Sequence, residues 1–125
     1  MANPSTIGPS GAGTEVLRRQ HVDGSGESLQ IVCAGLANHI MTILSVVVCS
    51  VGSPADTQFD MYIDYDLGGT SLNLIRNTAI GTNETFIFSD KIILTGTDRL
   101  TFQAYSTTGT AQCDIWCSYI DQQFS

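Results

Sequence analysis

Charge is scarce in this sequence, and positive charge is the scarcest. Only 14% of the 125 residues are charged, and five Lys and Arg stand against twelve Asp and Glu, a net charge of −7. Nucleic-acid binding requires clustered cations to contact phosphates, so this composition argues against a nucleic-acid partner. Soluble domains usually carry about 25% charged residues, and the shortfall predicts that another protein covers part of the surface.

Long apolar runs are also absent. The most apolar stretch, IMTILSVVVCSV at residues 40–51, is shorter than the roughly 20 residues that a membrane-spanning helix needs. The opening MANPSTIGPSGAG has neither the basic nor the apolar region of a secretory signal. We therefore expect no membrane association and synthesis in a cytoplasm.

Cysteine, histidine and catalytic motifs give little sign of a chemical site. The four cysteines are Cys33, Cys49, Cys113 and Cys117. They are too scattered for a disulfide scaffold, and Cys113 and Cys117 would lie about 13 Å apart along one strand, too far to bridge each other. Neither histidine has ligands at zinc-site spacing, and no nucleophile motif appears. We expect no enzyme activity, no metal and no cofactor, and interpret Asp60, Asp64 and Asp66 as solvated carboxylates.

The sequence does contain many short apolar or alternating segments, separated by turn residues and without a sustained helical period. These segments predict strands at residues 15–22, 28–33, 39–51, 57–65, 71–79, 84–88, 91–95, 98–105 and 112–120. About eight or nine strands at this spacing predict an all-β fold, an antiparallel β-sandwich or jelly roll. The β-branched run at 40–51 is expected to be its central strand, with protein on both faces.

Alternation along the strands predicts which side chains face inward. The expected inward set is Phe59, Met61, Ile63, Tyr65, Phe86, Phe88, Leu100, Phe102, Ala104, Cys113, Ile115, Cys117 and Tyr119. The aromatic side chains Tyr62, Tyr105 and Trp116 fall on outer faces. Three outward aromatics on a chain so poor in charge favour a protein–protein surface.

The N-terminal residues differ from the rest in composition. Residues 1–14 are rich in Pro, Ser and Gly, and Ile7 is almost their only apolar residue. Such a segment cannot bury enough apolar surface to fold alone, so we expect an extended arm at 1–14 and the sandwich domain at 15–125. Arg18 and Arg19 follow this arm and supply local positive charge for an acidic partner.

Residues 83–121 carry a resemblance to a known family. This block contains DKIIL at 90–94, a turn glycine, DRLTF at 98–102 and SYI at 118–120. It resembles the C-terminal half of small β-sandwich virion proteins of tailed bacteriophages, and residues 37–49 resemble their first long strand. The resemblance implies a structural subunit with no catalytic residues.

Three functions remain open at this point. The leading hypothesis is a capsid decoration (cement) protein, made in a bacterial host cytoplasm and located in the virion, which forms a homo-oligomer, with a trimer favoured, and binds the major capsid protein. The alternatives are a neck or tail component, such as a fibre-attachment adaptor, and a carbohydrate-binding module that stacks sugars on Trp and Tyr. The candidate interaction residues are Ile7, Arg18, Arg19, Tyr62, Tyr105 and Trp116.

Overall fold

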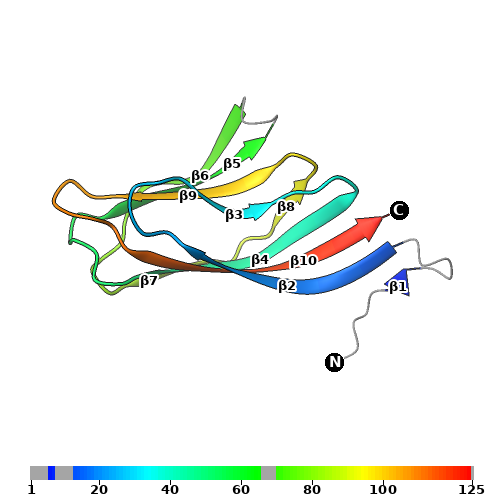
Figure 1. The fold of residues 1–125 in the computed structure, drawn as a ribbon, viewed down its shortest axis with the longest axis horizontal. Helices are drawn as coiled ribbons and strands as arrows, with labels where there is room; N and C mark the ends of the chain where they lie inside the picture. Colours follow the sequence, from blue (N-terminus) through cyan, green and yellow to red (C-terminus); the bar gives the residue numbers. More distant parts are fainter. Residues whose placement is uncertain (1–5, 8–12, 66–69, 125) are drawn as a thin grey trace.

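The computed structural model describes residues 6–7, 13–65 and 70–124, and the side chains of 15–65 and 71–124. These residues form two antiparallel sheets (Figure 1). The larger sheet contains β1 (Thr6–Ile7), β2 (Gly13–Asp23), β4 (His39–Ser50), β7 (Thr85–Phe88), β8 (Ile92–Thr95) and β10 (Cys113–Phe124). The smaller sheet contains β3 (Gln30–Ala34), β5 (Gln58–Tyr65), β6 (Thr70–Ala79) and β9 (Arg99–Tyr105). The predicted all-β sandwich is confirmed.

Each of the nine predicted strands is present, and two differences concern the chain ends. β10 continues to Phe124 rather than ending at 120, because Gln122 and Gln123 pair with β2 and β4 through backbone groups that need no apolar alternation. β1 pairs with Gly13 and Thr14 of β2, so four residues of the predicted arm, Thr6, Ile7, Gly13 and Thr14, belong to the sheet. The described residues include no helix that could cross a membrane.

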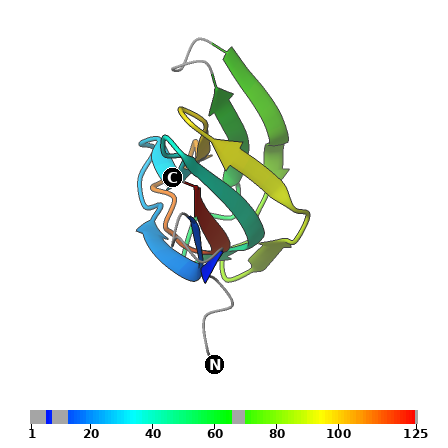
Figure 2. The same ribbon diagram turned by 90° about the vertical axis from the view of Figure 1, so that its right-hand side faces the viewer.

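β4 is the central strand of the larger sheet, as the sequence predicts. One edge of β4 pairs with β10, and the other edge pairs first with β8 and then with β7. The inward side chains Met41, Ile43, Val46 and Val48 are buried between the sheets. The outward side chains of this strand are only half-buried, because no described segment covers that face (Figures 1 and 2). The expectation of protein on both faces is therefore wrong within this chain.

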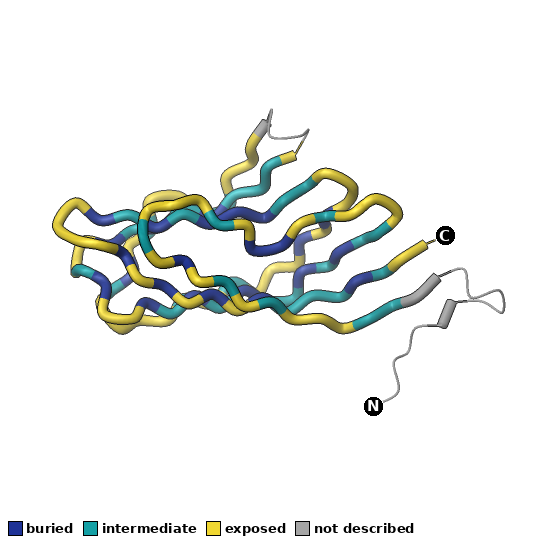
Figure 3. The backbone as a smooth tube through the Cα atoms, in the orientation of Figure 1, coloured by how far each residue is buried: buried dark blue, intermediate teal, exposed yellow. Residues whose placement is uncertain are grey.

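The core lies between the two layers, where the tube in Figure 3 is darkest. Phe102 stacks on Phe59 with ring centroids 5.5 Å apart, and Phe86 meets Phe59 edge-on at 5.2 Å. The inward assignments hold except at Tyr65, which is 41% exposed. The pairing of β5 with β9 ends at Asp64, so Tyr65 lies in the part of the β5–β6 hairpin that extends beyond the sandwich (Figure 2).

Candidate interaction surface

The outer face of the larger sheet carries two rows of largely apolar side chains and is uncovered by the described residues. Strand register aligns its outward side chains in rows across β2, β10, β4 and β8 or β7. One row is Leu17, Ile120, Thr42 and Ile93, and another is His21, Trp116, Val47 and Ile87; between them lie Arg19, Ser118 and Ser45. Leu17, Ile87 and Ile93 are each 63% exposed, and Trp116 is 40% exposed. Apolar side chains concentrated on one sheet face indicate a contact surface. We call these two rows the apolar face.

The outer face of the smaller sheet is polar by comparison. Its outward side chains on β5 and β9 are Gln58, Asp60, Tyr62, Asp64, Arg99, Thr101, Gln103 and Tyr105. Arg99 lies 3.7 Å from the Asp64 carboxylate, and the Thr101 hydroxyl donates to the Tyr62 carbonyl at 2.9 Å. Because these polar groups face water or one another, this side of the sandwich needs no cover.

Trp116 of the apolar face lies close to Arg19, which stands on β2 between the two rows. The Arg19 guanidinium carbon is 5.1 Å from the centre of the indole ring, a cation–π distance. A shallow hollow of about 270 Å³ lies here, lined by Leu17, Arg18, Arg19, Trp116 and Ser118. These two predicted interaction residues are therefore brought together, and they place a cation at the edge of an apolar surface.

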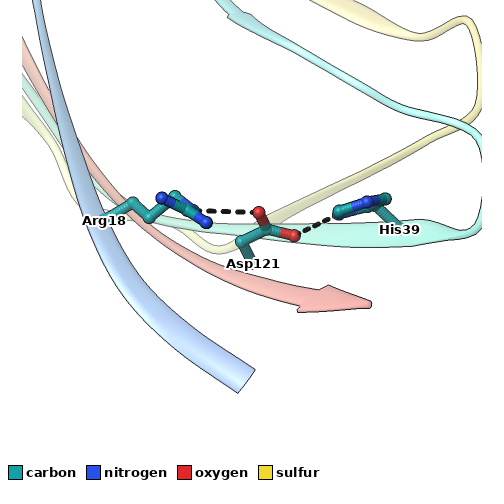
Figure 4. Close-up of polar contacts among 3 residues, drawn as sticks. All are labelled: Arg18, His39 and Asp121. Atoms are coloured by element: carbon teal, nitrogen blue, oxygen red, sulfur yellow. Dashed lines mark hydrogen bonds and ion pairs between the residues drawn. The ribbon is translucent and has the colours of Figure 1, made fainter. Parts of the chain in front are cut away.

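Arg18 points the other way, into the sandwich, because successive residues of a strand face opposite sides. Its Nε donates to a carboxylate oxygen of Asp121 at 3.0 Å, and Nδ1 of His39 lies 2.6 Å from the other oxygen (Figure 4). Asp121 is only 5% exposed, and a carboxylate buried to this extent requires hydrogen-bonding partners such as these two. Arg18 therefore joins β2 to β10, while Arg19 faces the outer side of the larger sheet; that both residues bind an acidic partner stays a prediction.

A recess of about 420 Å³ opens beside this cluster, between the edge of the larger sheet and the end of β3. It is lined by Arg18, Gln20, Ile31, Ala34, Leu36, His39, Met41, Tyr119 and Asp121. The predicted interaction residues include Arg18 of this cluster but neither His39 nor Asp121. The alternation that places Cys117 and Tyr119 inward also places Asp121 inward, and a buried carboxylate requires partners.

The remaining predicted interaction residues do not join the apolar face. Tyr62 and Tyr105 lie on the smaller sheet, and so face away from Trp116. The Tyr105 hydroxyl donates to the Asn77 side-chain oxygen, and burial raises the pKa of this tyrosine. Ile7 belongs to β1, but its side chain lies outside the described residues.

The predicted carboxylate group is dispersed. The Asp60 carboxylate accepts from the Asn77 amide at 2.7 Å, while Asp64 accepts from the Ser71 hydroxyl at 2.7 Å. Asp66 lies outside the described residues. Within the described part of the chain, no three His, Cys, Asp or Glu side chains are grouped as metal ligands would be.

Asp56 joins two loops at the end of the sandwich away from the Asp121 cluster. Its carboxylate accepts hydrogen bonds from the hydroxyl of Ser106 at 2.6 Å, the hydroxyl and amide of Thr107, and the hydroxyl of Thr108. Hydrogen bonds from Ser106, Thr107 and Thr108 hold the pKa of Asp56 well below its usual value. The turn before β10 is thereby tied to the turn after β4.

Comparison with known proteins shows a likeness of fold without a likeness of sequence. No protein-family model and no curated protein sequence matches the chain. A structure of infectious bursal disease virus, Gx strain, matches with a TM-score of 0.53 and 9% identity over 90% of this chain. The present chain spans only 32% of that viral chain, about a third of its length.

Two phage capsid structures match over nearly the whole of both chains. The acid-stable capsid of Helicobacter pylori bacteriophage KHP30 matches with a TM-score of 0.51 and 9% identity, over 86% of this chain and 92% of that one. The capsid asymmetric unit of cyanophage Pam1 matches with a TM-score of 0.50 and 14% identity, over 95% and 93%. The chain therefore has the β-sandwich fold seen in viral and phage capsid structures.

Proposed function

We propose that this chain is a structural protein of a bacteriophage virion, and within that class a capsid decoration (cement) protein that binds and stabilises the shell. The observation that carries the proposal is the length of the matched phage chains. The KHP30 and Pam1 chains are covered over more than nine-tenths of their length, so each is a small chain built around one such sandwich. A small chain of this kind within a capsid structure fits the role of an accessory subunit of the shell.

The surface of the sandwich supports the same proposal. An apolar sheet face exposed to water is costly, and large uncovered patches in soluble proteins mark contact sites. The polar outer face of the smaller sheet gives the molecule one side suited to water and one side suited to protein. A subunit that functions within an assembly needs this asymmetry, and a structural role needs no catalytic group.

Copy number tests the proposal against its nearest alternative. The chain and the major capsid protein should be quantified by isotope-labelled mass spectrometry in purified particles of the phage that encodes it. A decoration protein should be present at a copy number comparable with that of the major capsid protein. A copy number matching the neck or tail proteins would instead identify an adaptor, and absence from particles would overturn the virion assignment.

A further inference from the structure

We propose that the apolar face binds the same face of a second copy of this chain, with the two-fold axis parallel to the strands. The proposal concerns the isolated protein and does not depend on its place in a virion. It rests on three properties of the face: its size, the positions of its charges, and the pairing that its register imposes.

The size of the face suits an interface between two folded chains. Strands spaced about 4.8 Å apart and a rise of about 3.3 Å per residue along Glu15–Asp23 give roughly 19 by 27 Å across four strands for the apolar face together with the polar residues between and beside its rows. Because accessible surface follows the relief of the side chains, two such faces in contact would bury on the order of 1,200 Å², the lower limit of specific interfaces. Packed sheets lie about 10 Å apart with strand directions within about 30° of one another, so rows close to the two-fold axis stay opposite each other.

The charges at the borders of the face select the direction of the axis. An axis perpendicular to the strands would place Arg19 on Arg19 of the second copy and Glu15 on Asp23, and like charges in contact are strongly unfavourable. An axis parallel to the strands places β2 of one copy over β7 and β8 of the other. No two like charges among these three residues then meet.

The parallel axis also keeps Arg19 away from the Arg19 of the second copy. Arg19 lies level with the gap between β7 and β8, since β8 pairs with β4 up to Ile43 and β7 begins to pair at Val46. The connection across this gap, residues 89–91, contains the exposed Asp90 and the exposed Lys91. Arg19 of each copy would thus meet one charge of each sign at the rim, whereas the perpendicular axis would set it against a second Arg19.

The same axis brings apolar side chains together. In one row, Leu17 of each copy faces Ile93 of the other, and in the second row Trp116 faces Val47. The contact is isologous, so every pair occurs twice. The side chains that are 63% exposed in the single chain, Leu17 and Ile93 among them, become covered along the outer strands of the contact.

Sedimentation velocity on the purified chain and two charge variants tests this pairing. The parent should be a dimer at micromolar concentration. Leu17→Lys and Ile93→Glu should each weaken the dimer by about 100-fold or more, because each dimer then contains two buried, unpaired charges. An equimolar mixture of the two variants should dimerise again, because the new lysine of one chain faces the new glutamate of the other.

Leu72→Lys is the matched control. Leu72 is 54% exposed on β6 of the smaller sheet, and its substitution should leave the dimer unchanged. Circular dichroism should show that all three variants stay folded, since each changes an exposed side chain. A parent that is monomeric at high micromolar concentration, or a dimer that survives Leu17→Lys, would overturn the proposal. Loss of the dimer in both variants without its recovery in the mixture would contradict the contact between Leu17 of one copy and Ile93 of the other.

Discussion

Phe102 provides the most exacting test of the core, because its side chain is fully buried and stacked on Phe59. Replacing it with Ala leaves a cavity between the two sheets. A buried aromatic removes about 150–250 Å² from water, and the loss relative to Ala at roughly 25 cal/mol per Å² is about 3 kcal/mol. The cavity adds to this loss, so we expect a total of about 3–5 kcal/mol and a fall in Tm of roughly 10–20 °C.

Gly24 allows the geometry of this cavity to be tested directly. A Cβ at Gly24 would lie 2.9 Å from Phe102 Cε1 and 3.0 Å from Ile115 Cδ1, closer than side chains tolerate. Gly24→Ala should therefore cost about 1–3 kcal/mol in the parent. With Phe102→Ala already present, the methyl group enters vacated space, and its cost should fall by about 1–2 kcal/mol.

Urea denaturation of the four proteins, followed by far-UV circular dichroism, measures this coupling. The four are the parent, the two single variants and the double variant, with equal m-values as the check on two-state unfolding. Additive effects of the two substitutions would contradict the contact between Gly24 and Phe102. A change below about 1 kcal/mol for Phe102→Ala would contradict the inward assignment of β9.

Three further predictions concern the thiols and the buried or bonded carboxylates. With a thiol reagent, native protein should react first at the half-buried Cys49 and slowly at the three buried cysteines, since burial raises the pKa of Cys113 to about 11. The denatured chain should release four thiols. Release of fewer than three would reveal a disulfide. Asp56→Asn should lower Tm at pH 7. The difference in Tm from the parent should shrink as pH falls below about 4, because the folded pKa of Asp56 lies below its unfolded value. A difference in Tm that does not change with pH would refute the hydrogen bonds to a charged Asp56. Asp121→Ala should lower the free energy of unfolding, measured by urea denaturation, by about 2–4 kcal/mol. Arg18→Ala should lower it less, because the Arg18 side chain is 50% exposed. Equal losses in the two variants would contradict the central position of Asp121 in the cluster.

Much of the fold was predictable because a strand with one buried face alternates apolar and polar residues in the sequence. Alternation in β5, β9 and β10 depends on each strand having one face on the core, so the inward residues Phe59, Phe102 and Ile115 follow from spacing alone. β4 was recognisable by its run of Val and Ile. Two parts of the sheet could not be predicted from local pattern. β1 has no alternating pattern of its own, and the last residues of β10 belong to the sheet through backbone pairing with β2 and β4.

The interaction surface was less predictable, because it depends on which strands belong to each sheet and on their order within it. The sequence places Tyr62 and Trp116 on outer faces but cannot tell that these faces lie on opposite sides of the sandwich. The apolar face comes from strands far apart in the chain, since Leu17, Ile93 and Trp116 meet only through the strand order. Arg18 and Arg19 could have been separated in advance, since neighbours on a strand point to opposite sides. The division between arm and domain at residue 14 stays a prediction.

Electron cryomicroscopy of purified virions most directly tests the claim that this chain decorates a capsid. The account predicts density with the shape of the two-layered sandwich, repeated over the outer surface of the shell and in contact with the major capsid protein. Density of this shape confined to the neck or tail would contradict decoration while leaving a virion role. Particles whose density has no place for the sandwich would contradict the account as a whole.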